Sequence, residues 1–118
     1  MELDQHSKLL RIFIGELDKL DGTPLYEAIV LEAKKQGLAG ATVLRGILSY
    51  GASSRIHSAK LLDLSFDLPI IIEIIDTEIK IGKFLKVINL LIEQGGGGAL
   101  ITLEKVEVLY YRHKKSDD

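Results

Sequence analysis

Runs of apolar residues along the chain predict four β-strands, with two stretches of helical periodicity between them. A spacing of two places side chains on one face of a strand, whereas spacings of three and four build one face of a helix. The strands are expected at Leu9–Gly15, Ala41–Tyr50, Leu68–Asp76 and Ala99–Tyr111.

Two helices are expected between these strands. The first begins at Thr23-Pro24, where Thr23 would cap the helix and Pro24 would take the first helical position, and it ends at Gly37. The second follows Asp76 or Thr77, either of which is a suitable N-cap. Its apolar stripe continues until four consecutive glycines stop it.

The predicted order is therefore β-α-β-β-α-β, which is typical of the ferredoxin-like α+β fold. Right-handed crossovers place the first and third strands in the centre of a four-stranded antiparallel sheet, with both helices on one face. We expect a single domain over residues 1–118, with a core at about 8–111, a polar N-terminal tail and a charged C-terminal tail.

The second face of this sheet raises the question of assembly. Two helices cover only one face, so the other face of a monomer should be polar. The strand at Leu68–Asp76 is instead apolar on both faces apart from Glu73. Because burial of one isoleucine contributes roughly 1.5–3 kcal/mol, we expect the open face to pack against other subunits. The alternative is that the C-terminal segment or the long loop folds over it.

Composition and charge narrow the classes of partner. The formal net charge is −2, so the chain has no overall basic surface for nucleic acid. The absence of cysteine excludes disulfides and a thiolate nucleophile. No apolar run is long enough to span a bilayer, and the first residues lack a signal-peptide layout. We expect a cytoplasmic protein that does not insert into a membrane, although its target could be a membrane protein.

Two segments carry candidate binding chemistry. Successive backbone N–H groups of Gly95–Gly98 could surround an anion such as phosphate, or these glycines could simply end the helix. Arg45 lies inside an apolar strand and requires a partner, either a bound anion or Glu73 on the neighbouring strand. Further positive character follows Arg45 in the loop, at Arg55, His57 and Lys60.

Catalytic and metal-binding patterns are weak. The three histidines, His6, His57 and His113, are far apart, no two of them have i, i+4 spacing, and the sequence suggests no assembly of a zinc site or a Ser-His-Asp triad. We therefore predict no catalytic residue and no metal site.

Three runs of residues nevertheless resemble a known family. They are LLRIFIGELDK from Leu9, GLAGATVLRGILSYG from Gly37 and DLPIIIEIID from Asp67. These runs resemble the PII-like uncharacterised family classed as domain of unknown function one-ninety, and the resemblance extends from Leu9 to Val108. That family is similar in fold to the PII signalling proteins.

The resemblance implies a trimer with inward-facing sheets and adenine-nucleotide sensing in the clefts between subunits. It places the phosphate-binding turn on the four glycines and the partner-binding loop on Gly51–Phe66. The nucleotide site would then comprise Arg45, Gly46, Tyr50, Gly51, Arg55, Gly95, Gly96, Gly97 and Gly98. The loop that contacts a partner would present Ser53, Ser54, Arg55, His57 and Lys60. The basic residues of the PII turn are missing here, because no Lys or Arg occurs between Gly98 and Lys105.

The sequence thus favours a non-enzymatic regulatory protein that requires no cofactor. It would bind AMP, ADP or ATP as an effector and signal to an unknown protein partner through the loop at residues 51–66. One alternative is a trimeric divalent-metal-binding protein of the CutA type, with His57 and carboxylates as ligands. The other is an enzyme acting on a phosphorylated small molecule.

Overall fold

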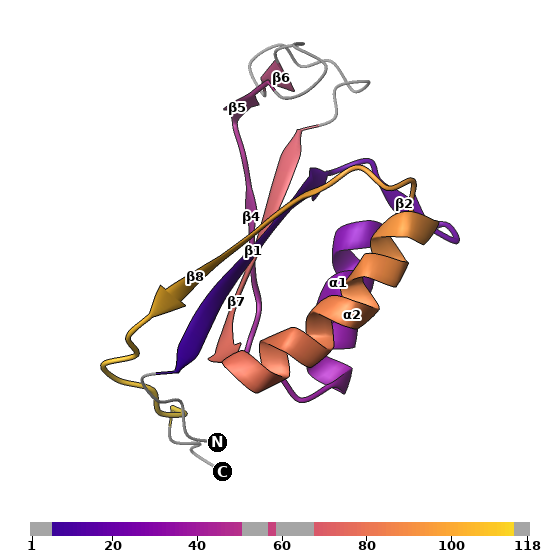
Figure 1. The fold of residues 1–118 in the computed structure, drawn as a ribbon. Helices are drawn as coiled ribbons and strands as arrows, with labels where there is room; N and C mark the ends of the chain where they lie inside the picture. Colours follow the sequence, from indigo (N-terminus) through magenta and orange to yellow (C-terminus); the bar gives the residue numbers. More distant parts are fainter. Residues whose placement is uncertain (1–5, 51–56, 59–67, 115–118) are drawn as a thin grey trace.

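The computed structural model describes residues 6–50, 57–58 and 68–114, which form one sheet packed against two helices (Figure 1). The main antiparallel sheet has the order β4-β7-β1-β8, with strands β1 (Ser7–Gly15), β4 (Thr42–Arg45), β7 (Pro69–Thr77) and β8 (Leu100–Val106). Helices α1 (Leu25–Lys35) and α2 (Glu78–Gln94) lie on the same side of the sheet. The fold is the expected ferredoxin-like α+β arrangement, with the first and third of the four expected strands in the centre.

The core lies between the two central strands and the helices. Ile12 and Ile72 are paired in register at its centre and are fully buried. Phe84 and Ile88 of α2 are also fully buried in the same cluster. The alternation of buried and half-buried positions along β1 and β7 confirms the period-two pattern of the sequence.

The two helices begin in different ways. Thr77 caps α2 as expected, because its hydroxyl accepts a hydrogen bond from the Lys80 N–H at 3.4 Å. The expected Thr23 cap of α1 is wrong: Pro24 occupies the cap position, without a side-chain hydrogen bond. Thr23 instead pairs with Leu20 in a hairpin of β2 (Lys19–Leu20) and β3 (Thr23–Pro24). The Asp-Gly turn at residues 21–22, with both φ angles positive, closes this hairpin.

The second expected strand is shorter than residues 41–50 because it breaks at Gly46. A Cβ atom at Gly46 would lie 2.4 Å from Pro69 Cγ, and the Gly46 N–H donates to the Pro69 carbonyl at 2.8 Å. Proline offers no N–H in return, so the ladder between β4 and β7 stops here. The chain then forms a separate hairpin of β5 (Leu48–Ser49) and β6 (His57–Ser58), which extends beyond the sheet (Figure 1).

The fourth expected strand is also shorter, since β8 ends at Val106 rather than at residue 111. The following residues cross the open face toward the β4 edge of the sheet, where the Tyr111 hydroxyl donates to the Ala39 carbonyl at 3.3 Å. The C-terminal segment therefore covers one corner of the open face, as the alternative expectation proposed.

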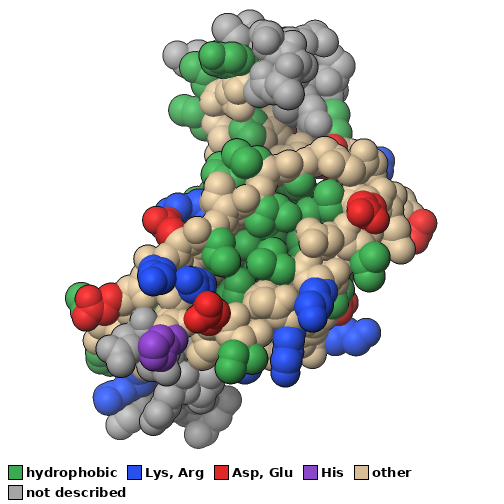
Figure 2. All heavy atoms as spheres, in the orientation of Figure 1, with side chains coloured by type: hydrophobic (Ala, Val, Ile, Leu, Met, Phe, Trp, Pro, Cys, Tyr) green, Lys and Arg blue, Asp and Glu red, His purple; other side chains and the backbone are tan. Residues whose placement is uncertain are grey.

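An apolar, accessible surface remains at the loop end of the open face and at the β8 edge. One row crosses all four strands and consists of Leu44, Ile71, Phe13 and Leu100. Leu44 and Leu100, at the two ends of this row, are 45% and 58% exposed. On the helix side of β8, Leu103 is also exposed, and hydrophobic side chains gather between β8 and α2 (Figure 2).

Candidate functional site

The sheet has two ends with different chemistry. We call the end where β1 and β4 finish and β7 and β8 begin the loop end, because the β5–β6 hairpin extends from it. We call the opposite end the tail end, because the C-terminal segment crosses it. The residues expected to bind a nucleotide belong to the loop end, whereas a pocket lies at the tail end.

Arg45 is the described cation of the expected nucleotide site. Its Nε forms an ion pair with Glu16 Oε2 at 3.1 Å, and its side chain is 56% exposed. The expected alternative pair with Glu73 is wrong for a geometric reason. Thr42 is the residue opposite Glu73, and Arg45, three positions further along β4, therefore points to the other face of the sheet.

Backbone hydrogen bonds fix the base of the expected partner loop next to this ion pair. The Glu16 N–H donates to the Leu68 carbonyl at 2.8 Å, and the Gly46 N–H makes the similar bond to Pro69. Arg45 and its carboxylate partner are thus adjacent to the point where residues 51–67 rejoin the sheet. A change in the Arg45–Glu16 pair would therefore directly affect the hydrogen bond between Glu16 and Leu68 at that junction.

The remaining loop residues divide into two groups. Tyr50 is 70% exposed beside the β5–β6 hairpin, in which Ser49 pairs with His57. The other predicted loop residues lie outside the described part of the chain, namely Gly51, Ser53, Ser54, Arg55 and Lys60. Their roles stay predictions.

The glycine turn ends α2 in a Schellman motif. The N–H of Gly97 donates to the Ile92 carbonyl at 2.8 Å, and that of Gly96 donates to the Glu93 carbonyl at 3.3 Å. Both glycines have positive φ angles, which side-chain-bearing residues rarely adopt. The N–H groups of Gly96 and Gly97 are therefore already hydrogen-bonded within the helix end. Phosphate binding by the glycine turn, including Gly98, stays a prediction.

One chain does not bring Arg45 and the glycine turn together. Arg45 lies on edge strand β4, whereas Gly98 leads into the opposite edge strand β8, with β7 and β1 between them. Three strand spacings of about 4.8 Å separate the two edges by about 14 Å. A single phosphate group therefore does not contact both Arg45 and the glycine turn of one chain.

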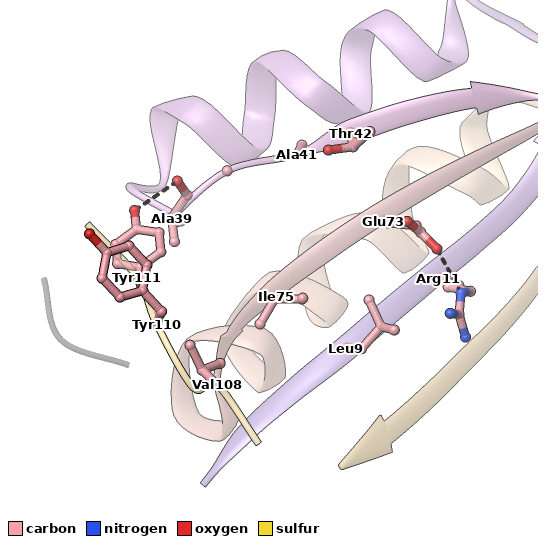
Figure 3. Close-up of a pocket in the computed structure, with 11 residues that line it drawn as sticks. Leu9, Arg11, Ala39, Ala41, Thr42, Glu73, Ile75, Val108, Tyr110 and Tyr111 are labelled. Carbon is pink, nitrogen blue, oxygen red and sulfur yellow. Dashed lines mark hydrogen bonds and ion pairs between the residues drawn. The ribbon is translucent and has the colours of Figure 1, made fainter. Parts of the chain in front are cut away.

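The tail end holds a preformed pocket of about 480 Å³. Figure 3 shows the Arg11–Glu73 pair at one end of it, Tyr110 and Tyr111 at the other, and Leu9 and Ile75 between them. One wall is formed by residues 39–42, the segment that leads into β4. Its size is within the range of small-molecule sites, and its lining is mostly apolar with a few polar groups.

Arg11 forms an ion-pair network across three strands of the open face. Its Nε donates to Glu73 Oε2 at 2.8 Å, and one of its terminal nitrogens donates to Glu104. These two hydrogen bonds, first to Glu73 and then to Glu104, raise the pKa of the Arg11 guanidinium above its ordinary value. The sequence interpretation missed this network. The sequence signal for this network is an arginine, Arg11, inside an apolar strand. The partners of Arg11 follow only from the register of β1 with β7 and β8.

A buried carboxylate supports the pocket wall. Asp76 is fully buried, and its two oxygens accept hydrogen bonds from the Ala39 N–H at 2.7 Å and the Thr77 N–H at 2.6 Å. Asp76 thereby joins the segment that leads into β4 to the start of α2. The pocket wall is thus tied to the core by Asp76 as well as to the C-terminal segment by Tyr111.

In the described part of the chain, no group of three or more His, Asp or Glu side chains is placed to hold a metal ion. No helix among these residues has the length and apolar character required to cross a membrane.

Solved structures share the fold at low sequence identity. A nitrogen regulatory PII-like protein, CPII, from Thiomonas intermedia, bound to ADP, AMP and bicarbonate, matches with a TM-score of 0.59, 19% identity and coverage of 86% of this chain and 89% of that chain. A putative PII-like signalling protein from Thermus thermophilus matches with a TM-score of 0.59, 21% identity and coverage of 90% and 93%. A phage SAM lyase in complex with S-methyl-5'-thioadenosine matches with a TM-score of 0.50, 15% identity and coverage of 95% and 98%. The same fold carries different functions, so function must be argued from the site.

Sequence relatives identify the family. A UPF0166 protein of Aquifex aeolicus is 47% identical over 103 residues, which cover 87% of this chain and 93% of the relative. The model of the DUF190 family, described as "Uncharacterized ACR", matches residues 7–108. The chain therefore belongs to the DUF190 family, as the three sequence runs indicated.

Proposed function

We propose that this protein is a non-enzymatic, PII-like regulator that binds an adenine nucleotide between subunits. The observation that carries the proposal is the placement of Arg45 and the glycine turn at opposite edges of one end of the sheet. Neighbouring copies that meet edge to edge would bring an arginine of one subunit to the turn of the next. The PII-like neighbour that holds ADP and AMP supports an adenine nucleotide as the ligand.

Assembly is supported by the surfaces that a monomer leaves open. The row from Leu44 to Leu100 on the open face is apolar, and both of its ends are exposed. Exposed Leu103 continues the apolar surface around the β8 edge. Continuous apolar patches of this kind are typical of subunit interfaces. We propose a trimer with the open faces inward, in agreement with the family resemblance.

Glu16 provides a mechanism for signalling. Its carboxylate forms an ion pair with the Arg45 guanidinium, and its backbone N–H donates a hydrogen bond to the Leu68 carbonyl at the base of the loop. A nucleotide phosphate that binds Arg45 would compete with Glu16 for the same donors. Occupancy would then alter the contact at Leu68 and shift the conformations of residues 51–67, by as much as the ligand discriminates between them.

Calorimetry with AMP, ADP, ATP and cyclic nucleotides tests the proposal on the intact oligomer. We expect micromolar to millimolar binding of at least one adenine nucleotide, weakened about tenfold or more by Arg45→Gln, because a charge-assisted hydrogen bond is lost. Arg11→Gln is the matched control, since it removes the other described arginine of the sheet. Absence of binding at millimolar nucleotide, or equal loss in both variants, would refute the proposed site.

A further inference from the structure

We propose that the tail-end pocket is a separate binding site for a small organic cation with an apolar body, such as an alkylammonium or arylalkylammonium compound. This inference does not depend on nucleotide binding at the loop end. It requires that the trimer proposed above packs through the loop-end row from Leu44 to Leu100 and leaves the tail end of the open face accessible to a ligand. It is carried by a preformed cavity of about 480 Å³ whose charged and aromatic groups lie at opposite ends (Figure 3).

The order of groups along the pocket defines the shape of the ligand. Glu73 lies at one end, Leu9 and Ile75 form an apolar floor, and Tyr110 and Tyr111 close the far end. Ile75 is 39% exposed although it points to the middle of this floor. A ligand with a polar head at Glu73 and a hydrophobic body against Ile75 and the tyrosine rings would cover that surface.

The polar head should be a donor and carry positive charge. Glu73 uses Oε2 to accept from Arg11, and within the described part of the chain no hydrogen bond to its Oε1 is found. Thr42, opposite Glu73 in the register, adds a hydroxyl at the same place. An ammonium group is a donor only, so it matches a free carboxylate oxygen beside a hydroxyl.

Charge balance argues against an anion in this pocket. Arg11 is shared by Glu73 and Glu104, so the network of one guanidinium and two carboxylates carries an excess negative charge. A phosphate or carboxylate ligand would meet an arginine that is already paired with two carboxylates, one of which, Glu73, lines the pocket. The pocket should therefore discriminate by charge, which requires a repulsive element as well as an attractive one.

A series of three probes with one shared body tests this charge preference. Phenylbutylamine, phenylbutanol and phenylbutyrate are titrated calorimetrically into the intact protein at neutral pH. We expect the amine to bind about tenfold more tightly than the alcohol, the amount that a charge-assisted hydrogen bond contributes, and phenylbutyrate to bind most weakly. Equal binding of all three probes, preference for the carboxylate, or no binding at millimolar amine would overturn the proposal.

Two variants of equal charge separate a ligand contact from a structural role. Glu73→Gln and Glu104→Gln each remove one partner of Arg11 and one negative charge, but only Glu73 lines the pocket. We expect Glu73→Gln to abolish the preference for the amine over the alcohol and Glu104→Gln to retain most of it. Equal effects in the two variants would show that the network acts only on folding or long-range charge, and the assignment of Glu73 would be wrong.

Discussion

The two arginines of the sheet, Arg45 at the loop end and Arg11 toward the tail end, differ in how completely they are paired. Arg45 is more than half exposed and has Glu16 as its described ion-pair partner. Arg11 is 37% exposed and is held by two carboxylates on the strands to either side. A guanidinium with one carboxylate partner can exchange it for a phosphate, whereas one held between two carboxylates favours a cation nearby.

The surroundings of the two arginines strengthen this contrast. At the loop end, backbone hydrogen bonds at Leu68 and Pro69 connect the sheet to the segment 51–67. At the tail end, the pocket wall is tied to the core by the fully buried Asp76. Under the two proposals above, the loop end would change when a ligand binds, and the tail end would receive a ligand without rearrangement.

Removing the carboxylate that holds the pocket wall should have the largest effect. Asp76→Ala leaves the N–H groups of Ala39 and Thr77 without their charged acceptor, so we expect a loss of about 2–4 kcal/mol in the free energy of unfolding. Urea denaturation followed by circular dichroism measures it. Asp76→Asn is the matched control, because its amide oxygen retains one of the two acceptors and should cost less. A loss below about 0.5 kcal/mol in Asp76→Ala would contradict a preorganised tail end.

The fold that places these sites was predictable because it depends on repeated patterns. The period-two positions of β1 and β7 and the apolar stripe of α2 each recur over several turns or residues, so local exceptions do not hide them. The β2–β3 hairpin has strands of two residues, too short for a period to appear. The sequence contains the Asp-Gly turn of this hairpin, but no local pattern indicates that Thr23 pairs with Leu20 rather than capping α1.

The sites were less predictable because they depend on register between distant strands. Arg11 contacts Glu73 and Glu104, which are 62 and 93 positions away. Arg45 contacts Glu16, which a pattern within one strand cannot reveal. The break at Gly46 likewise arises from Pro69 across the ladder. Charge in an apolar strand indicated that partners were required, and only the tertiary structure identifies them.

Exchanging each arginine for glutamine should separate binding from stability. We expect Arg45→Gln to weaken adenine-nucleotide binding about tenfold or more, with a stability loss of about 0–1 kcal/mol, as is usual for an exposed pair. Arg11→Gln should leave nucleotide affinity unchanged and lower the denaturation midpoint further, because Glu73 and Glu104 then repel each other. High salt should restore part of that midpoint by screening. If Arg11→Gln impairs nucleotide binding as much as Arg45→Gln does, the two ends are not independent.

Glu16→Gln should strengthen nucleotide binding. The variant retains a side-chain oxygen but removes the negative charge that competes with phosphate for Arg45, so we expect an increase in affinity of about two- to fivefold, consistent with an exposed ion pair. Calorimetric titration with the nucleotide that binds the unmodified protein measures the change. Glu27→Gln, at an acidic position in the first turn of α1, is the control for a general change in net charge. An unchanged or lower affinity in Glu16→Gln would remove Glu16 from the proposed mechanism.

The smallest effect is expected where the C-terminal segment closes the pocket. Tyr111→Phe removes the hydroxyl that donates to the Ala39 carbonyl at 3.3 Å. Because this bond is exposed and long, we expect a stability loss of about 0.5 kcal/mol or less, while the aromatic ring that closes the pocket remains. Amine binding, measured with phenylbutylamine, should therefore be nearly unchanged in Tyr111→Phe and clearly weaker in Tyr111→Ala, which removes the ring. Equal weakening in both variants would mean that the hydroxyl anchor, rather than the ring, organises the tail end, and the contrast between a preformed and an adaptable end would then rest on Asp76 alone.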